Sequence, residues 1–170
     1  MEDCSFSTRM LTKDPTLIQL YSFPTPNGIK VAVALEEILE LRKDKGDNMS
    51  GGNIQSEEEQ MLLYEPHAVN IRTGENRLPW YRELGFNSAK IPGIIDPLGP
   101  SGRRIALFES GSILLYLSEK YDALLPKDAA LRAESINWLF FGSTSISTQI
   151  KLFGFYYKYC SHNIPCMYFL

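Results

Sequence analysis

The first part of the chain alternates short apolar runs with longer stretches in which apolar residues recur at helical spacing. The run Leu17–Tyr21 predicts a strand. After a polar corner, apolar positions recur at the spacing of an amphipathic helix; they are Val31, Ala34, Leu35 and Ile38. Leu62–Ile71 regains strand character, and because proline cannot donate to a sheet ladder, Pro66 predicts an edge or irregular strand. Leu78–Leu84 predicts a short helix.

A hairpin and two further helices follow. Lys90–Pro97 and Ile105–Phe108 are apolar runs on either side of a Gly-Pro-Ser-Gly turn, which predicts two paired strands. Ser110 is predicted to cap the next helix, whose apolar face carries Ile113, Leu114, Leu117 and Tyr121. Another helix is predicted from Asp128 through Phe140. This order of strands and helices is typical of a small α/β layer fold.

Two stretches lack any such spacing. Residues 1–16 are predicted to form a loose arm. Lys43–Met61 combines glycines, polar side chains and the acidic run Glu57–Glu59, and is therefore predicted to be an insertion or surface loop. With 170 residues, 44% of them hydrophobic, the chain is long enough for one domain and the start of a second.

The charge and the cysteine content exclude several classes of protein. The net charge of -3 gives no electrostatic footprint for nucleic acid. No apolar run approaches the ~20 residues of a membrane-spanning helix, and the acidic, polar start does not resemble a secretory signal. Three cysteines without a Cys-x-x-Cys pair argue against a disulfide scaffold and favour a reducing compartment. A cytoplasmic protein without nucleic-acid or membrane partners is expected.

The corner between the first strand and the first helix is stiff and polar. It is the stretch SFPTPNGIK, Ser22–Lys30, in which two prolines flank Thr25 and an Asn-Gly pair begins at Asn27. Asn and Gly are common turn residues, so an ordinary turn is one interpretation. The other interpretation is a turn that holds a ligand.

Two further places have side chains suited to chemistry. Pro92 directly precedes a predicted strand, and the sequence alone favours a trans proline there, because only about 5–6% of X-Pro bonds in folded proteins are cis. Glu109 and Ser110 stand at the mouth of a helix, where free amides and the helix dipole favour a bound carboxylate. Ser110 could donate to the carboxylate of an amino acid and Glu109 could pair with its amine. The alternative is a plain N-cap.

Several of these stretches together resemble one family. FPTPNGIKVAVALEE, KIPGIIDP and FESGSILLYLSEKYDALLPKD are similar to glutathione S-transferases, in particular to the bacterial nu-class enzymes with disulfide-bond oxidoreductase activity and to their fungal prion-regulator relatives. RAESINWLFFG and FGFYYKY resemble the start of that family's helical domain. The resemblance covers Leu17–Tyr159, interrupted by the insertion.

The resemblance implies a fold, a ligand and a set of binding residues. A thioredoxin-like domain is expected at residues 17–125 and an incomplete all-α domain at 126–170. Pro92 is expected to be cis, and glutathione is the expected cosubstrate, with no metal. The backbone of Ile91 would meet the cysteinyl part of glutathione, Glu109 and Ser110 its γ-glutamyl end, and Lys90 its glycyl carboxylate.

The resemblance also places the stiff corner beside the glutathione sulfur. Thr25 and Asn27 stand where other classes of the family carry a Tyr, Ser or Cys, and both can donate a hydrogen bond that favours the thiolate. The implied function is glutathione-dependent transfer or disulfide reduction, with a small disulfide or electrophile as the second substrate. A homodimer and a role in detoxification are expected with it.

The sequence departs from the family's pattern in two ways. Phe86 and Ser88 replace asparagines of the family's Asn-Pro-Asn-x-Lys-Ile-Pro motif at the glycyl end of the site. The family's helical domain continues well past the point at which this chain ends, so a truncated product is expected. Two alternatives therefore stay open: a non-catalytic binding or regulatory protein that acts through its aromatic C-terminal end, and an inactive truncated form.

The sequence gives weaker support to the other candidate metal-binding and catalytic residues. Cys160, His162 and Cys166 lack a usual zinc spacing and a fourth ligand. His67, beside Pro66 in the predicted edge strand, is interpreted as a surface residue and not as a catalytic base.

Overall fold

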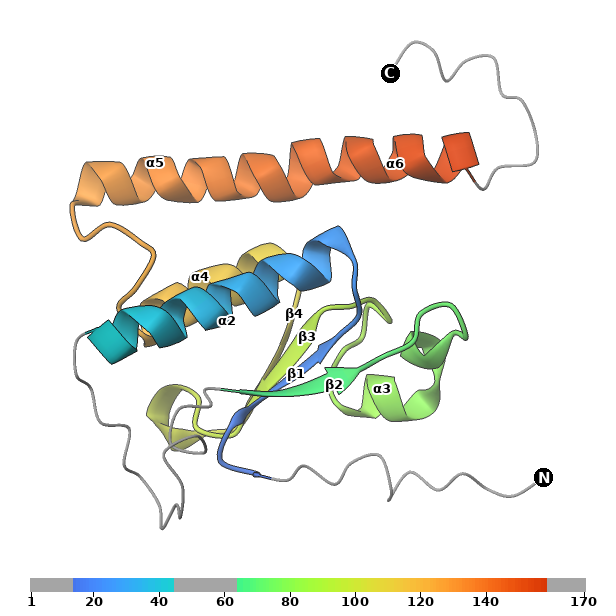
Figure 1. Ribbon diagram of the computed structural model, residues 1–170, viewed down its shortest axis with the longest axis horizontal. Helices are drawn as coiled ribbons and strands as arrows, with labels where there is room; N and C mark the ends of the chain where they lie inside the picture. Colours follow the sequence, from blue (N-terminus) through green and yellow to red (C-terminus); the bar gives the residue numbers. More distant parts are fainter. Residues whose placement is uncertain (1–13, 45–63, 159–170) are drawn as a thin grey trace. The chain divides into compact units, whose positions relative to one another are not determined.

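The structure, a computed structural model, describes residues 14–44 and 64–158 of a chain that divides into two compact units, Met1–Leu125 and Pro126–Leu170. The first unit contains a four-stranded sheet in the order β2-β1-β3-β4 (Figure 1). β1 pairs in parallel with β2 and antiparallel with β3, which pairs antiparallel with β4. The strands are β1 (Ile18–Ser22), β2 (Tyr64–Ala68), β3 (Gly93–Asp96) and β4 (Ile105–Phe108).

Helices cover both faces of this sheet, and strand alternation divides the core between them. On one face α2 (Pro26–Asp44) and α4 (Ser110–Lys120) pack against inward-facing residues of β1 and β3. This cluster consists of Ile18, Leu20, Val31, Leu35, Ile38, Ile94, Ile113, Leu117 and Ala123. The other face carries the short α3 (Pro79–Glu83) and a second cluster, which consists of Tyr21, Val69, Tyr81, Leu84, Phe86 and Ile95.

The hydrophobic pattern predicted most of these elements. The four residues assigned to the buried face of the first helix, Val31, Ala34, Leu35 and Ile38, are all at most 6% exposed. β2, which contains Pro66, is an edge strand as expected, and β3 and β4 form the expected hairpin. The α/β fold class is confirmed.

The predicted insertion begins too early. Lys43 and Asp44 are the last two residues of α2. Lys43 donates from Nζ to Oε1 of Glu40 at 2.6 Å, and basic side chains in the last turn of a helix are favoured by the helix dipole. The rest of the predicted insertion and most of the predicted arm lie outside the described residues.

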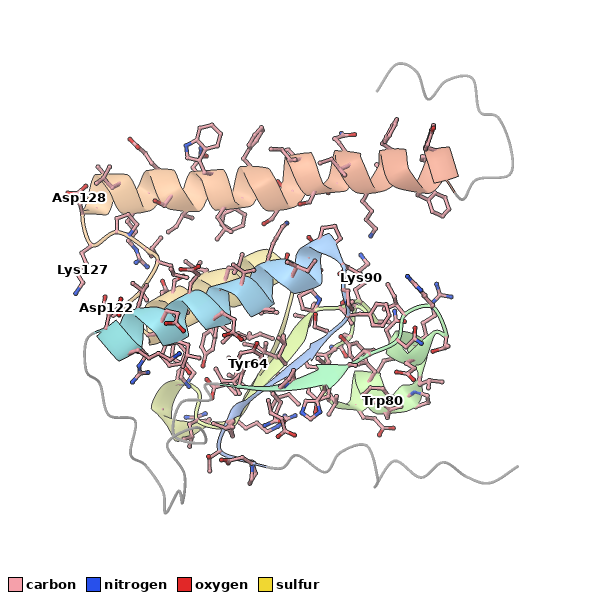
Figure 2. The ribbon with its side chains drawn as sticks, in the orientation of Figure 1. Tyr64, Trp80, Lys90, Asp122, Lys127 and Asp128 are labelled. Carbon is pink, nitrogen blue, oxygen red and sulfur yellow. The ribbon has the colours of Figure 1, made fainter. Side chains whose placement is uncertain are left out.

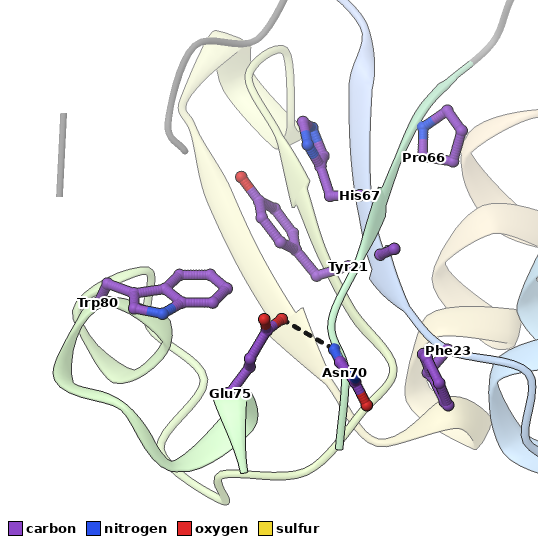
Figure 3. A pocket seen from close by; sticks show the side chains of 8 residues that line it. Tyr21, Phe23, Pro66, His67, Asn70, Glu75 and Trp80 are labelled. Atoms are coloured by element: carbon purple, nitrogen blue, oxygen red, sulfur yellow. Dashed lines mark hydrogen bonds between the residues drawn. The ribbon is translucent and has the colours of Figure 1, made fainter. Parts of the chain in front are cut away.

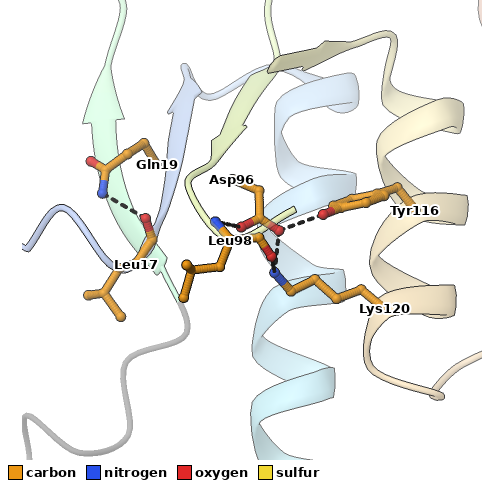
Figure 4. Close-up of polar contacts among 6 residues, drawn as sticks. All are labelled: Leu17, Gln19, Asp96, Leu98, Tyr116 and Lys120. Carbon is orange, nitrogen blue, oxygen red and sulfur yellow. Dashed lines mark hydrogen bonds and ion pairs between the residues drawn. The ribbon is translucent and has the colours of Figure 1, made fainter. Parts of the chain in front are cut away.

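A buried polar cluster stabilises the end of β3 at Asp96, which is 1% exposed. Its carboxylate accepts hydrogen bonds from the backbone N–H of Leu98 at 2.9 Å and from the phenol of Tyr116 at 2.5 Å. It also forms an ion pair with Lys120 (Figure 4). The cluster ties the β3–β4 hairpin to α4.

The described part of the second unit is helical from Ala129 to Lys158. α5 (Ala129–Phe140) and α6 (Ser147–Lys158) are joined by a π-helical segment, Phe141–Ile146. Asp128, the residue from which this helix was predicted to run, is its N-cap and accepts hydrogen bonds from the backbone N–H groups of Ala130 and Leu131 at 3.1 and 3.0 Å. Several large apolar side chains are exposed, among them Trp138 (66%), Phe153 (66%) and Tyr157 (82%).

Candidate functional site

The strand register brings the segments that contain the predicted site residues to one end of the sheet. Gly93, the first residue of β3, pairs with Tyr21 near the end of β1 and with Phe108 at the end of β4. The corner after β1, the segment before β3 and the start of α4 therefore meet at the same end. Lys90 lies at this end, where α2 begins (Figure 2).

Thr25 closes the corner that leads into α2. Its backbone N–H donates to the carbonyl of Phe23 at 2.7 Å, and its own carbonyl accepts the N–H of Ile29 at 2.9 Å. Its Oγ1 accepts the N–H of Gly28 at 3.2 Å, as an N-cap hydroxyl does. Because this bond uses a lone pair, the hydroxyl hydrogen remains for a donor bond.

Asn27 lies in the first turn of α2 and is half-buried. Its Oδ1 accepts a hydrogen bond from Nζ of Lys30 at 3.0 Å. This contact fixes which end of the carboxamide faces the lysine, so the amide NH₂ group is turned the other way. Thr25 and Asn27 thus each keep donor capacity at the corner.

Gly28 allows the corner its close approach to β1. A Cβ at this position would overlap the carbonyl oxygen of Phe23 and Oγ of Ser22. This close approach is what requires a glycine at position 28.

We expect Gly28→Ala to destabilise the protein by about 1–3 kcal/mol, because the extra methyl group forces backbone to move. A helical glycine in open space shows the opposite effect, with alanine more stable by roughly 0.5–1 kcal/mol. Gly154 in α6 is the matched control, since nothing lies within 4 Å of a Cβ placed there. Chemical denaturation of both variants measures the difference; a Gly28→Ala protein as stable as wild type would contradict the close approach.

The segment before β3 contains a cis peptide bond between Ile91 and Pro92. The sequence alone favoured a trans proline, and the family resemblance implied the cis form, which is the one present. Pro92 is buried, Ile91 is half-buried, and the side chain of Lys90 is exposed. The carbonyl of Lys90 accepts a hydrogen bond from the phenol of Tyr81 at 2.7 Å.

The start of α4 differs from its predicted form. Glu109, and not Ser110, is the N-cap residue, and no side chain caps this helix. Glu109 has a φ of 73°, outside the usual helix and strand regions, so the chain turns there and Ser110 becomes the first residue of α4. Ser110 is 7% exposed while Glu109 is exposed. An acidic side chain and a helix N-terminus with uncapped amides are thus adjacent.

A separate hollow of about 510 Å³ lies along the edge strand β2. Figure 3 shows Tyr21, His67, Glu75 and Trp80 on one side of the strand and Phe23 and Pro66 on the other. None of the predicted site residues lines this hollow.

His67, which lines this hollow, is not the surface residue that was expected. Its side chain is 17% exposed, its ring stacks on Tyr21 with centroids 4.6 Å apart, and its Nε2 lies 2.5 Å from Oε1 of Gln19. Burial lowers the pKa of His67, while the nearby Glu65 acts in the opposite direction. The two partners of His67, Tyr21 and Gln19, lie in β1, far from His67 in the sequence. The local sequence pattern around His67 therefore could not predict these contacts.

Neither a metal site nor a membrane span is found in the described ranges. No three His, Cys, Asp or Glu residues among 14–44 and 64–158 are grouped so as to hold a metal ion. No helix in the same ranges is both long and apolar enough to cross a bilayer. The three potential zinc ligands, Cys160, His162 and Cys166, lie outside the described residues.

Comparison with known proteins identifies similar chains. No protein-family model matches. An uncharacterised GST-like protein of Streptococcus mutans is 35% identical over 147 residues, which are 86% of this chain and 49% of the relative. The disulfide-bond oxidoreductase YghU of Escherichia coli is 37% identical over 142 residues, 84% of this chain and 43% of the relative. The chain thus spans about half the length of the curated relatives it matches.

Solved structures agree with the sequence comparison. A glutathione transferase from Pseudomonas putida, crystallised with one glutathione disulfide per subunit, superposes with a TM-score of 0.74 at 36% identity. The match covers 94% of this chain and 60% of that one. It confirms the thioredoxin-like N-terminal domain followed by helical structure. Over the region that aligns, the chain is similar to glutathione S-transferases, and its relatives include proteins named as disulfide-bond oxidoreductases.

Proposed function

We propose that this protein binds glutathione at the end of the sheet described above and uses its thiolate to reduce disulfides or to attack a small electrophile. The observation that supports this proposal best is the meeting of three segments at one sheet end: the donor-rich corner, the backbone before β3 and the start of α4. Relatives named as disulfide-bond oxidoreductases and as glutathione transferases support the same chemistry.

The charges at this end complement those of glutathione, which carries two carboxylates and one ammonium group. The amides at the start of α4 and the hydroxyl of Ser110 would bind the γ-glutamyl carboxylate. Glu109 would pair with the ammonium group, and Lys90 with the glycyl carboxylate. Ile91 would present its backbone to the cysteinyl residue between them.

The proposed reaction needs no protein thiol, and none of the described residues is a cysteine. The glutathione thiolate attacks one sulfur of a disulfide, so that a new S–S bond forms as the old one breaks and the leaving thiolate takes a proton from solvent. A second glutathione attacks the mixed disulfide and releases the second thiol. The substrate is reduced and two glutathiones become one glutathione disulfide.

Thermal unfolding of the full chain with reduced and oxidised glutathione tests the proposal. A ligand that binds only the native state adds about 2.7 kcal/mol of stability at a hundredfold excess over its Kd, so the melting temperature should rise by several degrees. Ser110→Ala should reduce this rise. Ser118→Ala is the matched control, because Ser118 lies in the same helix and donates to the carbonyl of Leu114 at 2.8 Å.

The analogue γ-glutamyl-alanyl-glycine, which lacks sulfur, separates tripeptide binding from recognition of the thiol. A sharp unfolding transition that none of these ligands moves would contradict the proposed function. That outcome would favour the non-catalytic alternative, a binding protein that acts by association. The C-terminal segment assigned to such contacts lies outside the described residues, so that alternative stays a prediction, as do the homodimer, the cytoplasmic location and the role in detoxification.

A further inference from the structure

The segment that precedes β3 is held from the core side by two side chains. The phenol of Tyr81, in α3, donates to the carbonyl of Lys90 at 2.7 Å. The carboxamide of Asn76 donates from Nδ2 to the carbonyl of Ala89 at 2.6 Å. Two consecutive carbonyls immediately before Ile91 are thus fixed by side chains and not by sheet hydrogen bonds.

The bond to Lys90 also sets the direction of the Ile91 amide. A peptide unit is planar, and in a trans unit the carbonyl and the N–H point in opposite directions. Because the carbonyl of Lys90 faces Tyr81 in the core, the N–H of Ile91 faces away from the core. No backbone hydrogen bond of Ile91 is found among the described residues, so this amide is available at the sheet end.

Tyr81 is itself rigidly placed. It is 0% exposed, and its ring packs against Phe86 and Trp80 with centroids 4.9 and 5.6 Å away. Ile91 packs against the same cluster. Burial raises the pKa of Tyr81, with Tyr21 acting in the same direction, so the phenol stays protonated and remains a donor.

Asn76 supports a part of the segment with an unfavourable backbone. Ala89 has a φ of 51°, a left-handed conformation that residues other than glycine adopt rarely. Its N–H donates a hydrogen bond to the carbonyl of Phe86 at 3.1 Å, and its carbonyl accepts the hydrogen bond from Asn76. Both backbone polar groups of Ala89 therefore have a partner. Without Asn76, the local preference of Ala89 would favour a different path into Lys90.

We propose that Tyr81 and Asn76 are positioning residues, which orient the Lys90–Ile91 peptide so that the Ile91 amide faces the cysteinyl part of glutathione. This inference rests on the proposed function. Neither side chain touches the ligand; each acts through a backbone carbonyl. Tyr81 has the larger effect because its bond is made by the peptide unit that contains the Ile91 amide.

Tyr81→Phe tests the inference, because it removes one hydroxyl and keeps the ring. In the full chain we expect glutathione to bind about five- to tenfold more weakly by titration calorimetry, the effect of about one hydrogen bond, with turnover at saturating glutathione little changed. Asn76→Ala should weaken binding in the same direction but less. In amide NMR spectra of Tyr81→Phe, the Ile91 cross-peak should shift.

Tyr116→Phe is the matched control. It removes an equivalent phenol, 2.5 Å from Oδ2 of Asp96, at the opposite end of β3. It should lower stability and leave glutathione affinity unchanged. If wild type binds glutathione and Tyr81→Phe binds it equally well, the positioning role is wrong while the proposed function stands. If wild type itself binds no glutathione, the proposed function fails and this inference fails with it.

Discussion

Replacing Thr25 and Asn27 together by alanine is expected to lower glutathione-dependent disulfide reduction by about 10²–10³-fold, the usual cost of removing donors aimed at a reacting anion. The hydroxyl of Thr25 uses a lone pair to cap α2, and Asn27 uses its oxygen to accept from Lys30. Both therefore have N–H or O–H groups left for the glutathione sulfur. Their loss would remove the groups that we propose favour thiolate over thiol.

The pH dependence of the rate distinguishes this role from a structural one. Without the two donors, the pKa of the bound glutathione thiol should rise, so the activity should increase only at higher pH than in wild type. The ultraviolet absorbance of the thiolate follows the same titration directly. Unchanged turnover in the double variant, at unchanged pH dependence, would rule out the mechanism.

Two conservative variants serve as controls. Thr25→Ser keeps both the cap and the donor and should remain active. Asn27→Asp keeps the acceptor for Lys30 but removes the amide donors, so it should lose activity without losing this contact. Thr25→Ala alone also removes the α2 cap and should cost about 1 kcal/mol of stability.

Asp96→Ala is expected to have the largest effect on stability. It removes the acceptor of the Leu98 amide, the Tyr116 phenol and the Lys120 ammonium group from a site that is 1% exposed. Breaking a buried ion pair by deleting one partner typically costs about 3–5 kcal/mol. The lower part of that range applies, because the side chain of Lys120 is 24% exposed and can turn to water.

Urea denaturation measures this loss, and Glu40→Ala is the control. Glu40 pairs with Lys43 on the surface of α2, with its side chain 63% exposed, and such pairs contribute about 0.5 kcal/mol. Asp96 is at the end of β3 away from Gly93, so the folded fraction of Asp96→Ala should bind glutathione as wild type does. A loss no larger than that of Glu40→Ala would show that the buried cluster contributes little.

The sequence predicted the elements because each depends on a local pattern. The helical spacing from Val31 to Ile38 and the apolar runs of the strands are decided by which side chains must be buried. The hairpin follows from two apolar runs and the turn between them. The cis form of Pro92 came from the family resemblance and not from local pattern, which favoured trans.

The structural features that were not predicted from the sequence depend on contacts between segments that are far apart in the chain. The burial of His67 is set by Tyr21 and Gln19 on the neighbouring strand. The hydrogen bonds from Tyr81 and Asn76 to the backbone before β3 could not be predicted from local sequence. A tyrosine on the apolar face of a predicted helix indicates only a position in the core. The N-cap of α4 was misplaced by one residue because the left-handed backbone at Glu109 is not encoded by a typical turn residue. The site residues and the domain bounds stay predictions.

The position of β1 in the sheet has a consequence for folding. β3, β4 and α4 follow one another in the sequence and contact one another directly, so they can form early as a local unit at little cost in loop entropy. β1 must join this unit on its free edge, and to do so the chain closes a loop that contains α2, β2 and α3. The sheet end that carries the proposed site is therefore complete only once this long-range pairing has formed.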